Sequence, residues 1–212
     1  MSIPKAIIVP ARLQSVRFPR KLLHPVRGQP LILHTANRIL SACPDIPLFF
    51  AVADAELQEV LASAGFEAIR TDPDLASGSD RIAAANREIG AEAVVNVQAD
   101  EPLVTCEQIE TLFALVEDGA EMSTLGTPLD DPDRFADPNQ VKVVRTTDGR
   151  ALYFSRAPIP WFRDSNGRLF PDGPDSGAVL GHLGLYGYRA AFLEKFVSLP
   201  PSPLERIERL EQ

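Results

Sequence analysis

Four cationic side chains stand close together near the N-terminus of a chain that is acidic overall. Arg12, Arg17, Arg20 and Lys21 lie within ten residues, and Ser15 adds a hydroxyl between them. The formal net charge of the 212 residues is −8. Guanidinium and ammonium groups at a junction of strand, loop and helix suit the binding of phosphate oxygens. The segment lacks the glycine-rich turn of a Walker motif, so the residues alone leave two possibilities, a triphosphate site and a solvated basic loop.

Two adjacent carboxylates form a second chemically distinctive group. Asp100 and Glu101 come shortly after the continuous apolar run Ala93–Val97. A carboxylate at the tip of a buried strand is a typical ligand for a hard cation such as magnesium, which would connect it to phosphate oxygens. The alternative is an acidic side chain stabilised by the dipole of the helix that follows. That alternative suits Glu101 better than Asp100.

Three further groups of residues carry weaker signals. Ser79 stands where the N-cap of a helix is expected, whereas Arg81, in the first turn, opposes the helix dipole and so indicates a ligand. His182 is a lone histidine in a β-like stretch, where a structural role is more common than a catalytic one. Arg156 and Arg163 flank a proline-rich segment, in which solvated arginines are common. Nothing in the order of serine, histidine, aspartate and cysteine supports hydrolase chemistry.

Composition and charge exclude several classes of protein. The chain is 45% hydrophobic and 24% charged, as in an ordinary globular domain. Its net negative charge argues against general binding of nucleic acid or anionic membrane. Cys43 and Cys106 fit neither a disulfide framework nor a zinc cluster, so each is expected to pack as a small apolar residue in a reducing cytoplasm. Because no signal peptide or membrane-spanning run is evident, we expect a soluble cytoplasmic protein.

The first half of the chain alternates strand patterns with helix patterns. Strands are predicted at Ala6–Pro10, Leu48–Val52, Glu67–Thr71 and Ala93–Val97, and helices at Leu31–Leu40, Ala55–Ala64, Ser79–Ile89 and Glu107–Glu117. This alternation predicts an α/β fold with a doubly wound, mostly parallel sheet. Ligands bind outside the carboxyl ends of the strands in such folds. Both charged groups follow a predicted strand at that end.

The second half changes character. Strands are predicted at Glu121–Thr127, Gln140–Arg145, Ala151–Ser155 and Gly181–Arg189, and helices at Ala190–Ser198 and Pro203–Glu211. The Asp148-Gly149 pair predicts a hairpin between the second and third of these strands. Residues Pro158–Gly177, rich in proline and glycine, are expected to form a mobile loop beside the site. The sequence therefore predicts a smaller antiparallel part beside the parallel sheet.

The motifs together resemble those of the 3-deoxy-manno-octulosonate (Kdo) cytidylyltransferase family. The segment Val9–Leu23, VPARLQSVRFPRKLL, is similar to the family signature at Pro10, Ala11, Arg12, Ser15, Arg17, Pro19 and Lys21. Further similar blocks, in the same order, are SGSDR at Ser77–Arg81, VNVQADEP at Val95–Pro102, YFSR and IPW within Tyr153–Trp161, GHLGLYGYR at Gly181–Arg189, and PSPLERIERLEQ at Pro201–Gln212. The resemblance extends from the first strand to the last residue.

The resemblance implies that CMP is transferred from CTP to Kdo, with release of pyrophosphate, for lipopolysaccharide biosynthesis. It implies catalytic roles for Arg12, Lys21 and Asp100, with Asp100 binding Mg2+. It implies CTP binding by Ala11, Arg12, Ser15, Arg17, Lys21, Ser79 and Arg81. It implies sugar binding by Gln98, Arg156, Arg163, His182, Tyr186 and Glu205, and Gln212 lies in the last similar block.

The resemblance also implies an architecture and an assembly. The fold expected is Rossmann-like, of the nucleotide-diphospho-sugar transferase type, in a single domain over residues 1–212. Residues 1–128 would bind CTP, and residues 129–212 would bind the sugar and form a homodimer contact around Tyr153–Trp161. The family continues for a few dozen residues beyond the position of Gln212, with a strand, a loop bearing a second metal-binding aspartate, and a closing helix. That portion is expected to be absent here.

Two departures and three alternatives accompany this resemblance. Arg20 and Ala99 each replace a glycine that is usual in the family, and Ala99 would restrict the backbone if its position required a positive φ. An amino-substituted Kdo or a sialic acid is an alternative substrate, although the HLG-YGYR and IPW blocks favour Kdo over sialate. A catalytically impaired nucleotide-binding homologue is the second alternative. A sugar-transferring glycosyltransferase, the third, is weaker because no DxD motif follows the central strand.

Overall fold

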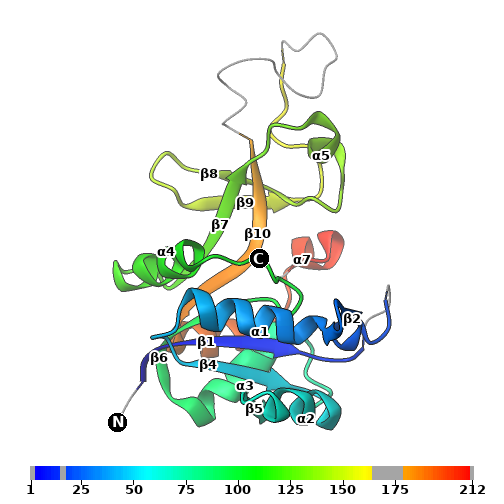
Figure 1. The fold of residues 1–212 in the computed structure, drawn as a ribbon. Helices are drawn as coiled ribbons and strands as arrows, with labels where there is room; N and C mark the ends of the chain where they lie inside the picture. The colour runs from blue at the N-terminus through cyan, green and yellow to red at the C-terminus, as the bar shows by residue number, and fades with distance from the viewer. Residues whose placement is uncertain (1–2, 15–17, 164–178, 211–212) are drawn as a thin grey trace. The chain divides into compact units, whose positions relative to one another are not determined.

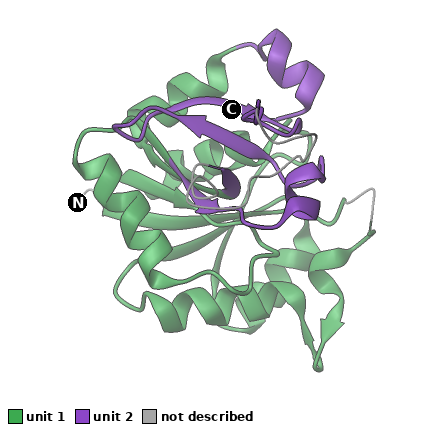
Figure 2. Ribbon diagram, turned by 90° about the horizontal axis from the view of Figure 1, so that it is seen from above, with its two compact units in different colours: residues 1–123, 184–199 green, residues 124–183, 200–212 purple. Residues whose placement is uncertain are grey.

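The structure, a computed structural model, describes residues 3–14, 18–163 and 179–210 of the chain (Figure 1). Two compact units can be distinguished (Figure 2): unit 1 comprises Met1–Ser123 and Gly184–Leu199, and unit 2 comprises Thr124–Leu183 and Pro200–Gln212. Each unit is thus built from two separate stretches of the chain.

Unit 1 is built on a parallel sheet whose strands alternate with helices along the chain. β1 (Ile3–Ala11), β4 (Leu48–Val52), β5 (Glu67–Arg70) and β6 (Ala91–Asn96) lie in the order β5-β4-β1-β6. Continuous apolar strands are typical of sheets covered on both faces, and the C-terminal part of β1 is entirely buried. The second half of β10 (Leu180–Arg189) pairs antiparallel with β6. The predicted doubly wound, mostly parallel sheet is confirmed.

Helices cover the sheet of unit 1. They are α1 (Leu31–Ala42), α2 (Ala55–Ser63), α3 (Gly78–Ile89), α4 (Cys106–Glu117) and α6 (Ala190–Ser198). Ala6 and Ile8 of β1 belong to one core layer together with Ile82 of α3 and Leu193 of α6. Because side chains alternate along a strand, the neighbouring Ile7 faces the opposite side, where α1 lies in Figure 1. Burial of both faces holds the strand ends in fixed positions.

The N-terminus of α3 corrects one prediction. Ser77, and not Ser79, is the N-cap: its hydroxyl accepts a hydrogen bond from Asp80 N (3.1 Å), and the Asp80 carboxylate accepts one from Ser77 N (3.0 Å). This reciprocal capping box places Ser79 inside the first turn, where it is buried. The helix stops at Gly90, whose φ of 74° lies in the left-handed region that favours glycine.

The segment after β1 contains short elements that the sequence patterns did not predict. Residues Lys21–Leu23 form a 3-10 helix, η1, and β2 (Pro25–Val26) pairs with β3 (Gln29–Pro30). Arg27 and Gly28 have positive φ angles of 48° and 84°, as a two-residue type I′ turn requires. Elements of two or three residues show no periodicity from which they could be predicted.

Unit 2 contains the predicted antiparallel hairpin. β8 (Lys142–Arg145) pairs with β9 (Ala151–Ser155), with Lys142 opposite Ser155, and the turn residue Gly149 has a φ of 95°. The first half of β10 pairs antiparallel with β8. β10 is therefore the strand in which the chain leaves unit 2 and returns to unit 1.

Three more elements belong wholly or partly to unit 2. β7 (Met122–Pro128) carries the chain into it, the unpredicted α5 (Pro132–Ala136) follows, and α7 (Pro203–Glu208) closes it. The predicted helix Pro203–Glu211 is too long, because Arg209 adopts a left-handed conformation with a φ of 52°. Most of the predicted loop Pro158–Gly177 lies outside the described residues.

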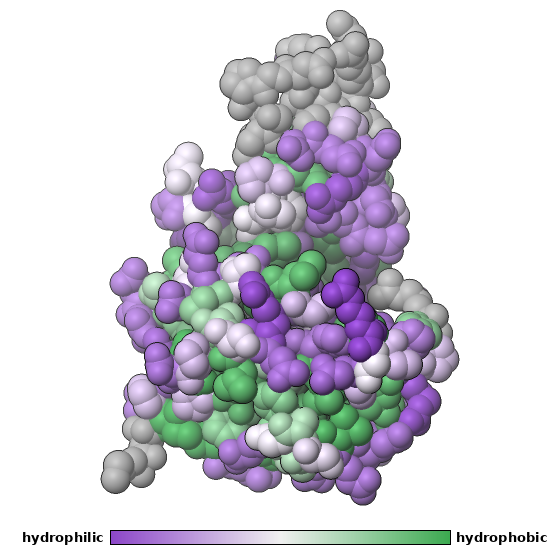
Figure 3. All heavy atoms as spheres, viewed as in Figure 1, coloured by the Kyte–Doolittle hydropathy of each residue, from purple (hydrophilic) through white to green (hydrophobic). Residues whose placement is uncertain are grey.

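Two further observations concern the length of the helices and the character of the surface. No helix in residues 3–14, 18–163 and 179–210 is long and apolar enough to cross a membrane. The face drawn in Figure 3 carries hydrophobic residues, in green, between hydrophilic ones, in purple. Such mixed surfaces are usual in folded proteins.

Candidate active site

The loops after β1, β4 and β6 place charged side chains at the carboxyl end of the unit 1 sheet. Arg12 directly follows β1 and is exposed, Asp54 follows β4, and Asp100 follows β6. The loop after β4 is joined to the end of β1 by a hydrogen bond from Ala53 N to Ala11 O (3.0 Å). In doubly wound sheets this is the edge where ligands bind. The structure therefore brings the predicted phosphate and metal groups to one end of one sheet.

Asp54 is a residue of this edge to which sequence analysis assigned no role. It occupies the N-cap position of α2 with an extended backbone (φ −117°, ψ 137°), yet its side chain does not cap that helix. The carboxylate instead accepts a hydrogen bond from Leu13 N (2.8 Å), 41 residues away in the chain. An N-cap aspartate normally bonds the first N–H groups of its own helix. Here it anchors the backbone immediately after Arg12.

Lys21 and Asp100 form an ion pair between the first and third of these loops. The Lys21 ammonium, in η1, donates to the Asp100 carboxylate, and the two side chains are 36% and 39% exposed. An exposed pair of this kind contributes little to stability, about 0–1 kcal/mol. Both charges therefore remain available to a ligand that carries phosphate or a cation.

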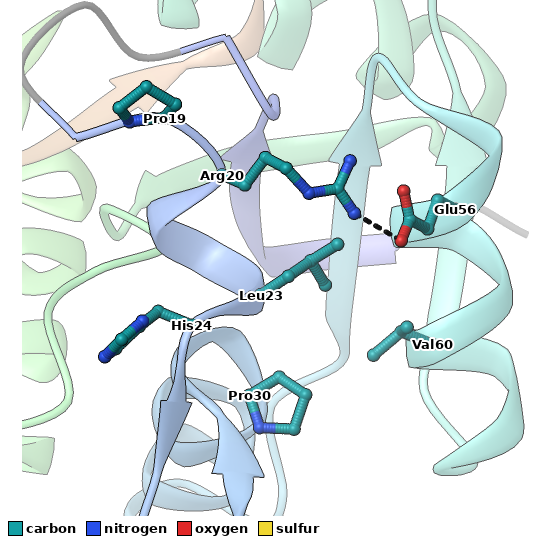
Figure 4. Close-up of a pocket in the computed structure, with 7 residues that line it drawn as sticks. All are labelled: Pro19, Arg20, Leu23, His24, Pro30, Glu56 and Val60. Atoms are coloured by element: carbon teal, nitrogen blue, oxygen red, sulfur yellow. Dashed lines mark hydrogen bonds and ion pairs between the residues drawn. The ribbon is translucent and has the colours of Figure 1, made fainter.

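Arg20 pairs with a different partner. Its guanidinium donates to Glu56 of α2 at 2.5 Å, across a pocket of about 440 Å³ that Leu23, Pro30 and Val60 help to line (Figure 4). Its backbone is left-handed, with a φ of 58°, which is costly for a residue other than glycine. Arg20 stands where a glycine was expected, and the conformation explains that expectation. The positive charge of Arg20 is paired with the carboxylate of Glu56.

Arg81 of α3 is a buried cation. It is 2% exposed, and its Nη1 donates to Thr71 Oγ1 (2.5 Å) and to Asp72 O (3.0 Å), while Nη2 has no partner among the described residues. Burial, and then the nearby positive charge of Arg12, lower the pKa of Arg81. The guanidinium thus holds the loop after β5 and shares the electrostatic environment of Arg12.

The carboxylates after β6 differ in their surroundings. Desolvation, and then the neighbouring Asp100, raise the pKa of Glu101. Glu101 lies before Thr105, the N-cap of α4, so it is not in the first turn of that helix. Ala99 is buried and is not among the described residues with positive φ. Its methyl group therefore does not strain the loop, and Gln98, two residues before Asp100, is half-buried.

Asp100 is an exposed carboxylate at this edge that a divalent cation could reach. Within the ranges that the structure describes, no group of three or more His, Cys, Asp or Glu side chains is arranged to hold a metal. Mg2+ commonly binds through one or two carboxylates and completes its octahedral shell with water and substrate phosphates. Asp100, exposed and beside Lys21, fits that mode of binding.

His182 and Tyr186 lie on β10, in unit 2 and unit 1 respectively. His182 Nε2 is 2.9 Å from Thr124 Oγ1, and its ring stands edge-on to Phe154, with the centroids 4.9 Å apart. Burial lowers the pKa of His182 to about 4, so its imidazole is neutral at pH 7. Tyr186 is buried and stacks on Tyr188, with 6.1 Å between ring centroids.

Arg156, a predicted sugar ligand, is occupied by backbone carbonyls of unit 2. Its Nε donates to Glu208 O (2.6 Å), Nη1 to Pro138 O (3.0 Å) and Nη2 to Arg209 O (3.3 Å). A guanidinium has five N–H donors, so two remain beyond these three bonds. Arg156 therefore closes the end of α7 onto the β8–β9 hairpin with most of its donors.

Glu208 and Lys142 are structural residues of unit 2 that sequence analysis did not identify. The Glu208 carboxylate accepts hydrogen bonds from Ser155 Oγ (2.7 Å), Tyr153 Oη (2.9 Å) and Arg156 N (2.9 Å). The hydrogen bond from Ser155 is the largest cause of its lowered pKa. Lys142 is fully buried and donates to two carbonyl oxygens, one of them Arg156 O (2.8 Å). These bonds tie β8, β9 and α7 together.

The remaining predicted residues are placed as follows. Glu205, a predicted sugar ligand, is the N3 residue of α7, and its carboxylate accepts a hydrogen bond from Ser202 N in a capping box. Ala11 is the buried last residue of β1, and Arg163 is exposed at the end of a described stretch. Ser15, Arg17 and Gln212 lie outside the described residues.

Comparison of the sequence with known proteins gives concordant matches. A family described as cytidylyltransferase matches residues 6–212. A 3-deoxy-manno-octulosonate cytidylyltransferase of Leptothrix cholodnii is 44% identical over 212 residues, which cover 97% of this chain and 77% of that protein. The enzyme of the same name from Xanthomonas oryzae pv. oryzae is 43% identical over 211 residues, which cover 97% and 81%.

Solved structures include one with a closely similar fold. A CMP:2-keto-3-deoxy-manno-octonic acid synthetase, complexed with CTP, superposes with a TM-score of 0.87 at 33% identity, over 98% of this chain and 83% of that chain. A cytidylyltransferase of Leptospira borgpetersenii gives a TM-score of 0.57 at 15% identity, over 96% and 68%. The second match shows a shared fold alone.

Proposed function

The chain belongs to the cytidylyltransferase family, and we propose that it transfers CMP from CTP to Kdo to give CMP-Kdo and pyrophosphate. The observation that carries the proposal is the meeting of Lys21 and Asp100 at the carboxyl end of the unit 1 sheet. A cation for phosphate and a carboxylate for a metal are the two groups that this chemistry needs at one place.

The reaction is a nucleotidyl transfer. The anomeric hydroxyl of Kdo attacks the α-phosphorus of CTP, a new P–O bond forms, and the bond to pyrophosphate breaks as the hydroxyl loses its proton. In such reactions the protein mainly positions the reactants and neutralises negative charge. Lys21 and the exposed Arg12 supply positive charge for the triphosphate. Asp54 helps to position Arg12 because its carboxylate fixes the backbone at the next residue, Leu13.

Magnesium is proposed as the cofactor, with Asp100 as its ligand from the described residues. When bound, it would offset charge on the phosphate oxygens and orient the α-phosphate. Asp100 would hold the ion, and its ion-pair partner Lys21 would supply positive charge for the triphosphate. The ion pair between Lys21 and Asp100 would keep both side chains at the sheet edge before the substrates bind.

The assignments for CTP and sugar differ in their structural support. For CTP, Ala11, Ser15, Arg17, Ser79 and Arg81 remain proposals by family resemblance, and the burial of Ser79 and Arg81 favours indirect roles. For the sugar, Gln98, Arg156, Arg163, His182, Tyr186 and Glu205 remain proposals. The neutral imidazole of His182 suits a hydrogen bond to a sugar hydroxyl, and the hydrogen bonds of Arg156 and Glu205 favour support of the backbone.

A cytoplasmic homodimer is proposed for the assembly. Leu152 of β9 and Trp161 are 67% and 76% exposed, and exposed apolar side chains of this size are common at protein interfaces. Gel filtration with light scattering tests the dimer: Leu152→Glu should give monomers, whereas Leu103→Glu, at a leucine of unit 1 that is 79% exposed, should not. A monomeric wild-type chain would contradict the proposal.

The activity is tested by pyrophosphate release from CTP. Release should require both Kdo and magnesium, and EDTA should abolish it. Parallel reactions with UTP and GTP test the nucleotide, and reactions with 8-amino-Kdo and sialic acid test the sugar. Release with UTP or GTP but not with CTP would overturn the proposal. Binding of CTP without turnover of any of the three sugars would instead support a catalytically impaired homologue.

A further inference from the structure

Cys43 and Cys106 lie in direct contact in unit 1, although 62 residues separate them in the chain. Cys43 is the C-cap residue of α1, and Cys106 is the first residue of α4. Their sulfur atoms are 2.9 Å apart, and both thiols are free. Two helix ends that are otherwise fixed by the core therefore hold two sulfurs close to bonding distance, since a disulfide bond is about 2 Å long.

The two thiols differ in exposure and in chemical environment. Cys43 is buried, with 4% exposure, whereas Cys106 is partly exposed. Burial, and then its hydrogen bond to Cys106, raise the pKa of the Cys43 thiol to about 12. Cys43 therefore keeps its proton and donates to the sulfur of Cys106. Cys106 is thus the group that would react first.

We propose that Cys43 and Cys106 form a redox-active dithiol that hydroperoxides convert to an intramolecular disulfide. The Cys106 sulfur attacks one peroxide oxygen, an S–O bond forms, the O–O bond breaks, and water leaves with the thiol proton when the oxidant is hydrogen peroxide. The Cys43 sulfur then attacks the sulfenic sulfur of Cys106. The S–S bond forms, the S–O bond breaks, and the hydroxyl leaves as water with the proton of Cys43. Both sulfurs are oxidised and the peroxide is reduced.

The disulfide would strengthen a connection that the reduced protein already has. Arg38 of α1 donates from Nε to Val104 O (2.7 Å), two residues before Cys106. The oxidised pair would add a covalent bond between the same helix and the segment that leads from Asp100 to α4. A crosslink that closes a long loop restricts the unfolded chain. This inference concerns the thiols of unit 1 and does not depend on the proposed function.

The test is oxidation of the folded chain by hydrogen peroxide, followed by catalase, denaturation, alkylation with N-ethylmaleimide and intact mass measurement. The oxidised protein should lose two hydrogen atoms, take up no maleimide, and regain two reactive thiols after dithiothreitol. Peptide mapping should recover the peptides of Cys43 and Cys106 as one linked species. The melting temperature should rise by at least about 4 °C on oxidation and return on reduction.

Single serine variants separate the two steps. Cys43→Ser should stop at a sulfenic acid on Cys106, which dimedone traps. Cys106→Ser should leave Cys43 reduced under the same treatment, because the buried thiol reacts slowly. The proposal fails if both wild-type cysteines still take up maleimide, if the disulfide joins two chains, or if oxidation lowers the melting temperature.

Discussion

Unit 1 and unit 2 use the same kinds of charged side chain in opposite ways. At the sheet edge of unit 1, Arg12 is exposed and Lys21 and Asp100 contact each other at the surface. In unit 2, Lys142 and Arg156 donate to backbone carbonyls. The first arrangement leaves charge for a ligand, and the second consumes it in holding strands and a helix. Similarity to a family motif does not distinguish these two uses, whereas the hydrogen-bond partners do.

The largest effect is expected at Lys21. Lys21→Ala should lower kcat for pyrophosphate release by about 10²–10³-fold, because a charge that stabilises the transition state is worth about 3–4 kcal/mol. The melting temperature should change little, since the ion pair with Asp100 is exposed. Arg20→Ala, one residue earlier and also in an exposed ion pair, is the matched control. Equal losses of kcat in both variants would contradict a specific role for Lys21.

The pH dependence of stability should reveal the half-buried His182 of unit 2. Its pKa falls from 6.5 to about 4 on folding, so the unfolded state binds the proton more tightly. Its stabilising contribution is present above pH 6.5 and is lost as the pH falls toward 4, by at most about 3 kcal/mol. Urea unfolding from pH 7 to pH 4 measures this loss. His182→Gln should flatten the dependence, and an unchanged slope would contradict the assignment.

Lys142→Met should destabilise the protein by about 2 kcal/mol. Methionine fills the space of the lysine stem, but the carbonyls of Asp137 and Arg156 each lose a buried hydrogen-bond donor. The free energy of unfolding in urea measures the effect. Lys195→Met, at an exposed position of α6, is the control and should change stability by less than about 0.5 kcal/mol. Equal effects would show that the buried contacts are unimportant.

Two variants of Asp54 test whether its carboxylate positions the backbone for CTP binding. Asp54→Ala removes the acceptor for Leu13 N and should raise KM for CTP about tenfold, or ~1.4 kcal/mol. Asp54→Asn keeps an oxygen acceptor and should recover most of the affinity. Steady-state kinetics with varied CTP measure both. A loss of stability in the alanine variant without a change in KM would assign Asp54 to the fold alone.

The smallest effect is expected for Arg20→Gly. Glycine relieves the left-handed backbone of Arg20, by about 1 kcal/mol, but it adds unfolded-state entropy and removes the exposed pair with Glu56. The net change in stability should stay below about 1 kcal/mol, and kcat should stay within about twofold. A tenfold fall in kcat would instead place Arg20 among the residues that bind the triphosphate.

The unit 1 sheet was predictable because apolar strand runs and helical patterns alternate several times along its sequence. Apolar runs such as Leu48–Val52 became strands with the predicted bounds, and each helix between them shows helical spacing. The Ser77 cap was also readable, since Asp80 three residues later forms the acidic half of a capping box. The prediction of Ser79 as the N-cap did not take this spacing into account. The hairpin of β2 and β3 and the turn at η1 were too short to leave a pattern.

The site was predictable in part. Lys21 and Asp100 could be expected to meet, because each follows a strand of one parallel sheet. The burial of Arg81 and the carbonyl partners of Arg156 could not be predicted. Similarity to a motif shows which residue is present, but it does not show what surrounds that residue. Asp54 directly precedes α2, the usual place of an N-cap residue. Only the three-dimensional register of β1 and β4 brings it to Leu13.

The way in which β7 and β10 connect the units has an evolutionary consequence. The chain leaves unit 1 after Ser123 and returns at Gly184, and inside unit 1 the two strands lie together, with Arg189 N donating to Glu121 O (3.0 Å). Residues 124–183, which include parts of both strands, are therefore an insertion into unit 1. Its length and sequence can diverge while the ends of the flanking strands stay in place. The strand order β5-β4-β1-β6 of the unit 1 sheet can therefore be kept while this insertion changes.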